Sequence, residues 1–221
     1  AGADIVINSR SRKEMDEAMS YILDGTGRQG HCVVADLFKR EDTVRLAREA
    51  LEAMGRVDII VNNAGTNIVS PVDKIVDQDW DKLIELNLTA PMVLVRECAD
   101  QMKERKWGRI VNISSIFGMC TKNERGGYSA TKSGLIGITR TMAQDLAPWG
   151  ITANAIAPGP ISTPLTDRMV QGELREYFNS MLLGRWGTPE DLIGPVLLLS
   201  SDAGSFITGT TLTVDGGWMT H

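Results

Sequence analysis

Histidine is nearly absent from this chain of 221 residues, which contains only His31 and the terminal His221. A Ser-His-Asp hydrolase would have to be built around His31, in a turn-rich stretch beside an expected strand. The sequence also contains no GxSxG nucleophile motif. A zinc site would lack ligands for the same reason, so we expect no metal site. The scarcity of histidine therefore argues against both a hydrolase and a metalloenzyme.

Cysteine pairs, long apolar runs and clustered positive charge are also missing. The three cysteines lie far apart and form no CxxC pair, so we expect reduced thiols in a cytoplasmic protein. The longest apolar runs, such as GPVLLL, are too short to cross a bilayer. The formal net charge is −5 and no basic stripe occurs. Neither a membrane nor a nucleic acid is therefore an expected partner.

Strand and helix patterns alternate along the whole chain. Continuous apolar runs predict strands at 5–7, 32–36, 57–63, 108–114, 151–157 and 210–217. Helical spacing of apolar residues predicts helices at 11–22, 41–54, 78–105, 128–146 and 190–200. This alternation predicts a single domain over 1–221, an α/β fold with a doubly wound parallel sheet covered on both faces. Ligands of such folds bind at the carboxyl ends of the strands.

A tyrosine and a lysine lie one turn apart at the start of an expected helix, in the segment YSATK. The spacing puts Tyr128 and Lys132 on one helix face. A free tyrosine has a pKa of about 10, and an ammonium about 4–6 Å away would lower it. Ser115 ends the preceding strand, where its hydroxyl could hold a carbonyl oxygen beside the phenol. The three residues together indicate a tuned acid–base site, whereas the tyrosine and lysine alone would fit an ordinary helix surface.

Two further segments fit a ligand site. The residues NNAG (62–65) end a strand, and their amides and glycine suit close approach of a flat ligand. Asn87 lies inside an apolar helical stretch, where an amide is costly to bury, so it should bond something specific. By contrast, GGYSATKS only approximates a phosphate loop, because Thr131 replaces the second glycine and no strand leads into it.

In these residues the sequence resembles the short-chain dehydrogenase/reductase family over its whole length. The resemblance implies a Rossmann-like fold and a catalytic tetrad of Asn87, Ser115, Tyr128 and Lys132. Tyr128 would be the proton donor or acceptor, and Ser115 would orient the substrate oxygen. Lys132 would bind the nicotinamide ribose and lower the tyrosine pKa, and Asn87 would hold a relay water.

The resemblance also implies a set of cofactor-binding residues. NNAG matches the family's sheet-stabilising and cofactor motif, Asp36 and Leu37 match its adenine contact, and PGPISTP (158–164) matches the loop that holds the nicotinamide carboxamide. The residues expected to bind the cofactor are Ser9, Arg10, Asp36, Leu37, Asn63, Ala64, Gly65, Tyr128, Lys132, Pro158, Gly159, Ile161 and Thr163.

Family members open with a strand, a T-G-x-x-x-G-x-G turn that cradles the pyrophosphate, and a helix. The present sequence does not contain this unit, so we expect an N-terminally truncated chain. Because that first strand normally lies in the middle of the sheet, the remaining sheet is expected to have a gap.

Cofactor choice can be predicted at the end of the first expected strand. NAD enzymes usually place an Asp there to bind the ribose 2′-hydroxyl. Ser9 and Arg10 occupy this place, and an arginine can pair with a 2′-phosphate. The sequence therefore favours NADP over NAD.

The predicted function is an NAD(P)-dependent oxidoreductase acting on a carbonyl or secondary alcohol. The segment GRWGTPEDLIGPVLLLSSDA resembles the sugar-acid and polyol branch, including gluconate 5-dehydrogenases. The 3-oxoacyl-carrier-protein reductase branch is one alternative, and a non-catalytic remnant acting as an interaction protein is another. The family resemblance further implies a cytoplasmic homotetramer.

Overall fold

The computed structural model describes residues 2–163, 166 and 181–220. Its strands and α-helices alternate along the chain as predicted. In order they are β1 (Ile5–Ser9), α1 (Arg12–Leu23), β2 (Gly30–Val34), α2 (Arg40–Met54), β3 (Ile59–Asn62), α3 (Asp77–Ile84), α4 (Ala90–Arg105), β4 (Gly108–Ile113), α5 (Gly126–Leu146), β5 (Ile151–Pro158), α8 (Ile193–Ser200) and β6 (Thr211–Val214). A π-helical turn, Glu85–Thr89, joins α3 to α4 and interrupts the continuous helix predicted over 78–105.

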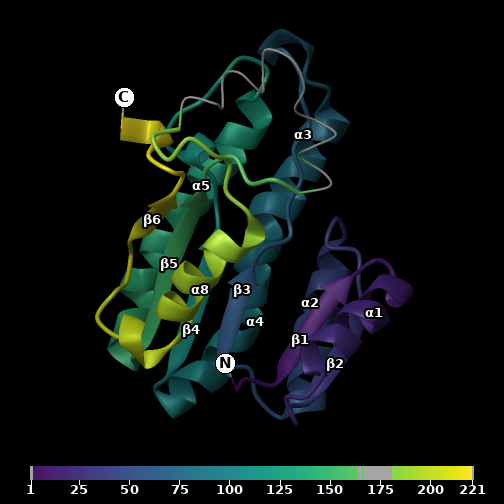
Figure 1. The fold of residues 1–221 in the computed structure, drawn as a ribbon. Helices are drawn as coiled ribbons and strands as arrows, with labels where there is room; N and C mark the ends of the chain where they lie inside the picture. The colour runs from purple at the N-terminus through teal and green to yellow at the C-terminus, as the bar shows by residue number, and fades with distance from the viewer. Residues whose placement is uncertain (1, 164–165, 167–180, 221) are drawn as a thin grey trace.

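The strands form two parallel sheets (Figure 1). One has the order β1-β2 and the other the order β3-β4-β5-β6. All pairings are parallel, and in the larger sheet Asn62 of β3 lies opposite Asn112 of β4. Within the residues that the structure describes, β1 and β3 form no ladder with each other. The gap expected in the sheet is therefore present between β1 and β3.

Local capping explains where several helices begin and end. The Ser11 hydroxyl accepts a hydrogen bond from the Glu14 amide and so caps the first turn of α1. Helix α2 ends at Gly55, which adopts the left-handed conformation that a side chain would oppose. These local signals set the α1 and α2 boundaries close to those predicted.

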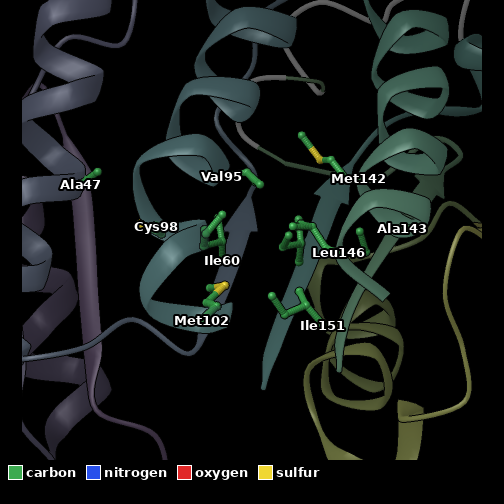
Figure 2. Packing of buried hydrophobic residues seen from close by; sticks show 12 residues of the cluster. Ala47, Ile60, Val95, Cys98, Met102, Met142, Ala143, Leu146 and Ile151 are labelled. Carbon is green, nitrogen blue, oxygen red and sulfur yellow. The ribbon is translucent and has the colours of Figure 1, made fainter. Parts of the chain in front are cut away.

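Hydrophobic cores fill both faces of the larger sheet. On one face, helices α4 and α5 pack Val95, Met102 and Met142 against the strands (Figure 2). The neighbouring β4 residues Ile110 and Val111 are both fully buried, but they belong to different clusters. Val111 packs with Leu199 of α8, on the face opposite α4 and α5. The double burial of β4 confirms the predicted parallel sheet covered on both sides.

None of the described helices combines the length and apolar composition needed to cross a membrane. Cys32, Cys98 and Cys120 are all free thiols. Burial raises the pKa of the Cys98 thiol to about 11, which makes it a weak nucleophile.

Candidate active site

The predicted catalytic residues converge beside the carboxyl ends of β3 and β4. Ser115 lies just beyond β4, while Tyr128 and Lys132 occupy the first turns of α5. The Ser114 hydroxyl donates a hydrogen bond to the Lys132 carbonyl at 3.0 Å, which ties α5 to the end of β4. The three side chains singled out from the sequence therefore share one site.

The Lys132 side chain is buried and bonded to the carboxyl end of β4. Its side chain is only 4% exposed, and Nζ donates a hydrogen bond to the Ile113 carbonyl at 2.8 Å. Nζ also lies 5.7 Å from the centroid of the Tyr128 ring. Burial lowers the pKa of the Lys132 ammonium to about 8. A lysine in this state can exchange its proton near neutral pH.

The pKa of Tyr128 differs from the sequence expectation. Burial of the phenol raises it, while a hydrogen bond with Ser115 and the charge of Arg125 act in the opposite direction. The Lys132 ammonium donates its hydrogen bond to the Ile113 carbonyl and lies 5.7 Å from the centroid of the Tyr128 ring. The expected net lowering of the Tyr128 pKa is therefore wrong for this structure, because burial of the phenol has the larger effect.

Ser115 is held by the turn that follows β4. Its Oγ accepts a hydrogen bond from the Phe117 amide at 3.2 Å, and its side chain also bonds Tyr128. The rings of Phe117 and Tyr128 meet edge to face, with centroids 6.5 Å apart. The serine and the phenol are thus fixed relative to each other by a short turn and an aromatic contact.

Asn87 bonds specific partners, as its burial required. It lies in the π-helical turn, fully buried. Its Oδ1 accepts from the Thr66 amide at 2.9 Å, and its Nδ2 donates to the Thr66 carbonyl at 2.9 Å and to Thr131 Oγ1 at 3.1 Å. Asn87 therefore links the loop after β3 to α5.

Gly65 lies between two of the predicted catalytic side chains. A Cβ at this position would lie 3.3 Å from Asn87 Oδ1 and 3.3 Å from Lys132 Nζ. Glycine is favoured because an added Cβ would push both groups away by a few tenths of an ångström. Asn63 and Ala64 connect the end of β3 to Gly65, and the Asn63 amide donates a hydrogen bond to the Val61 carbonyl at 3.1 Å. This loop fits the predicted role of carrying backbone up to a flat ligand.

The predicted adenine-end residues lie at the carboxyl ends of β1 and β2. Ser9 Oγ accepts from the Ser11 amide at 3.2 Å, and the Arg10 guanidinium lies 5.8 Å from the centroid of the Phe38 ring. Asp36 Oδ1 accepts from the Phe38 amide at 3.3 Å, and Leu37 is buried. These residues are on the smaller sheet, and Leu37 packs in one cluster with Leu86, the chain neighbour of Asn87.

The predicted carboxamide loop begins at the carboxyl end of β5. Pro158 ends the strand, and Gly159 packs so closely on Asp215 that a Cβ would meet its Cα at 2.8 Å. Ile161 forms a bridge with Gly187, and Thr163 Oγ1 lies 2.9 Å from Thr166 Oγ1. Pro164, which completes the PGPISTP segment, lies outside the described residues.

Sequence reasoning missed two supports and one charged residue. Asn112 Oδ1 accepts from Asn62 Nδ2 at 2.7 Å, and Asn112 Nδ2 donates to Thr139 Oγ1 at 2.8 Å, so a buried amide ties β3 to α5 through β4. A polar residue inside the apolar run GRIVNIS was the available signal. Ser114 is the second support, and buried Arg125 next to Tyr128 is the charged residue.

The chain is similar to known oxidoreductases over nearly its whole length. A model of the family described as "Enoyl-(Acyl carrier protein) reductase" matches residues 1–219. The 3-oxoacyl-[acyl-carrier-protein] reductase FabG of Aquifex aeolicus is 34% identical over 217 residues, which cover 98% of this chain and 88% of that protein. The corresponding reductase of Synechocystis is 33% identical, with 98% and 87% covered.

Solved structures agree with this fold. A gluconate 5-dehydrogenase from Burkholderia cenocepacia, in complex with NADP and tartrate, superposes with a TM-score of 0.91 at 32% identity, covering 100% of this chain and 87% of that one. A blue fluorescent protein from a metagenomic library, in complex with NADPH, gives 0.90 at 31% identity, covering 99% and 88%. With the matched family and the fold in agreement, this chain belongs to the short-chain dehydrogenase/reductase family of NAD(P)-dependent oxidoreductases.

Proposed function

We propose that this chain transfers hydride between NADP and a carbonyl or secondary alcohol, with Tyr128 as the proton donor or acceptor. The observation that carries the proposal is the convergence of three groups: the Tyr128 phenol, the Ser115 hydroxyl that bonds it, and the buried Lys132 ammonium. A bound nicotinamide dinucleotide supplies the hydride for reduction or accepts it in oxidation. The polypeptide supplies the proton and the positioning.

The proton moves at the phenolic oxygen of Tyr128. During reduction the phenol donates its proton to the carbonyl oxygen as this oxygen becomes an alkoxide, and in oxidation the phenolate takes the alcohol proton. Ser115 Oγ holds the same substrate oxygen beside the phenol. The buried Lys132 ammonium stabilises negative charge that develops in this region, because a charge acts more strongly where water is excluded.

Asn87 is proposed to position a water molecule and the loop that follows β3. Both Nδ2 hydrogens are used by Thr66 and Thr131, while Oδ1 accepts one bond and retains a second lone pair. That lone pair is available to a water molecule that relays protons from the site. Asn87 also keeps Thr66, and with it the Gly65 backbone, close to Lys132.

We further propose that the residues after β1, β2, β3 and β5 hold the dinucleotide. The close approach of the Gly65 backbone supports this, because a side chain would fill the space beside Lys132. Arg10 is proposed to pair with the 2′-phosphate of NADP. Two similar solved structures contain NADP or NADPH, which is consistent with this choice.

The proposed substrate is a sugar acid or polyol. Similarity to a gluconate 5-dehydrogenase structure supports it. Reduction of a 3-oxoacyl thioester is the second candidate, favoured by the curated relatives of the chain. Initial rates with D-gluconate and NADP⁺, compared with those for an acetoacetyl thioester and NADPH, distinguish the two.

The chemistry is tested by Tyr128→Phe, which removes one oxygen and keeps the ring. We expect kcat to fall by at least about a hundredfold while NADPH affinity, followed by fluorescence, is retained. Tyr21→Phe, on the exposed face of α1, is the matched control and should leave kcat unchanged. Near-normal turnover in Tyr128→Phe would remove Tyr128 from the mechanism. Absence of NADPH binding in the unmodified protein would favour a non-catalytic interaction protein.

A cytoplasmic homotetramer is proposed for the assembly. Large apolar residues that are exposed near β6 and on α8, Phe206, Ile193 and Leu197, support association between copies. Light scattering of Phe206→Glu beside the unmodified protein tests this. An unchanged mass for the variant would place the association elsewhere.

A further inference from the structure

Arg125 occupies the turn of α5 next to the candidate catalytic pair. It is the N-cap residue of the helix, and its carbonyl accepts a hydrogen bond from the Ser129 amide at 2.8 Å. Spacings of three and four residues put Arg125, Tyr128 and Lys132 along one stripe of the helix. The charge of Arg125 is close enough to lower the pKa of the Tyr128 phenol.

The Arg125 guanidinium is buried, and within the described part of the chain it lacks the partners that a buried charge requires. The residue is only 9% exposed, and Nη1 is buried with no hydrogen-bond acceptor. Among the described residues, no carboxylate forms an ion pair with it, and the adjacent Glu124 is itself exposed. Burial accordingly lowers the pKa of Arg125.

A second buried arginine among the described residues, Arg109, has the partners that Arg125 lacks. Arg109 is 3% exposed, and it donates to the carbonyls of Gly108 and Ser201, pairs with Asp202 at 3.3 Å and stacks on Trp107 at 4.3 Å. The Arg109 guanidinium therefore has acceptors and a counter-charge, and its role is structural. A buried cation without such partners is costly, and this cost is offset when an anionic ligand supplies the acceptor oxygens.

We propose that Arg125 binds the carboxylate of an acidic substrate and so selects hydroxy acids and oxo acids over neutral polyols. The inference rests on the proposed function, because it places the substrate carboxylate beside the Tyr128 phenol. Arg125 is on the tyrosine side of the site, whereas the groups proposed for the cofactor 2′-phosphate lie on β1. A planar guanidinium also suits bidentate pairing with a carboxylate.

The experiment compares two probes that differ at one terminal carbon: D-gluconate carries a carboxylate there, and D-glucitol a hydroxymethyl group. Arg125→Met, Arg125→Lys and the unmodified protein are assayed with each probe and NADP⁺. Arg140→Met, an exposed arginine on the same helix, is the matched control. Binding of D-gluconate is followed separately by tryptophan fluorescence, because Trp186 and Trp218 pack in one cluster with Tyr128.

In Arg125→Met we expect the KM and the Kd for D-gluconate to rise by about 10- to 100-fold. The kcat/KM for D-glucitol and the affinity for NADPH should be unchanged, and Arg125→Lys should recover part of the loss. Equal losses with both probes would make Arg125 a structural residue and overturn the proposal. Unchanged binding of D-gluconate in Arg125→Met, or no binding to the unmodified protein, would also overturn it.

These outcomes remain distinct from failure of the proposed function. Loss of the Arg125 role changes D-gluconate binding alone, while the oxidoreductase assignment depends on NADPH binding and on Tyr128→Phe. If the unmodified protein turns over only the thioester, the hydride chemistry stands and the carboxylate proposal is rejected.

Discussion

Lys132 Nζ donates a hydrogen bond to the Ile113 carbonyl at 2.8 Å, so the last residue of β4 holds a buried ammonium in the site. That single bond does not replace the water that an ammonium binds in solution. The pKa of about 8 shows that the charged form is disfavoured in the folded protein. The charged Lys132 side chain is therefore expected to lower the free energy of unfolding, although the proposed reaction uses it.

Replacing Lys132 by methionine is expected to stabilise the fold near neutral pH. The pKa falls from 10.5 to about 8 on folding, so the folded state disfavours protonation at any pH below the unfolded value. The penalty is complete below about pH 8 and disappears as pH rises towards 10.5. After loss of the bond to Ile113, we expect a net gain of about 1–2 kcal/mol at neutral pH.

Urea unfolding of the cofactor-free protein at about pH 7 and pH 10 measures this effect. Lys13→Met, at an exposed position of α1, is the control and should change neither value. A Lys132→Met variant that is less stable at neutral pH, or a difference independent of pH, would contradict the expectation.

Gly65→Ala is expected to reduce activity without unfolding the protein. The added Cβ would lie 3.3 Å from both Asn87 Oδ1 and Lys132 Nζ, so these groups must move by a few tenths of an ångström. Such displacements of positioned groups cost rate, and we expect kcat to fall by about tenfold or more. Steady-state kinetics and circular dichroism test this, with Gly137→Ala, which has open space around it, as the control. Full activity in Gly65→Ala would show that the close approach of the Gly65 backbone to Asn87 and Lys132 is not needed for catalysis.

Much of the fold could be predicted because the strands are continuous apolar runs. Strands β3, β4 and β5 and helices α2 and α5 lie within a few residues of their predicted bounds. The π-helical turn at Glu85–Thr89 was not predicted, because its cause is tertiary. Asn87 bonds Thr66, twenty-one positions earlier, and Thr131, forty-four positions later, and neither partner can be read from the local pattern.

The candidate site was predicted as a set of residues, and its electrostatics were not. Spacing put Tyr128 and Lys132 on one face, and Ser115 at a strand end, as the structure has them. The pKa of Tyr128 depends on burial, which spacing alone does not give. Arg125 was missed for a similar reason: the segment KNERGGY has the composition of an exposed turn, although its arginine is buried.

Asn87→Leu is expected to destabilise the protein and lower its activity together. The substitution keeps the branched shape of the side chain but leaves the amide and carbonyl of Thr66 without their partner. Buried groups left unpaired cost about 1–3 kcal/mol each, so we expect at least that loss in the free energy of unfolding. Thr131→Val removes only one of the three bonds and should cost less. Equal stability of Asn87→Leu and the unmodified protein would mean that water replaces the lost bonds.

Arg10→Asp is expected to move cofactor preference from NADP towards NAD. Arg10 follows β1 and lies over Phe38, 5.8 Å from the ring centroid, so its guanidinium is held at the strand end rather than on α1. A carboxylate there would repel a 2′-phosphate and could accept a hydrogen bond from the 2′-hydroxyl of NAD. We expect the ratio of kcat/KM for NADP to that for NAD to fall by about tenfold or more, which corresponds to one charge-assisted contact. Lys13→Asp makes the same charge change on the exposed face of α1 and should leave the ratio unaltered. If both variants shift the ratio equally, the effect comes from overall charge; if neither does, Arg10 does not choose the cofactor.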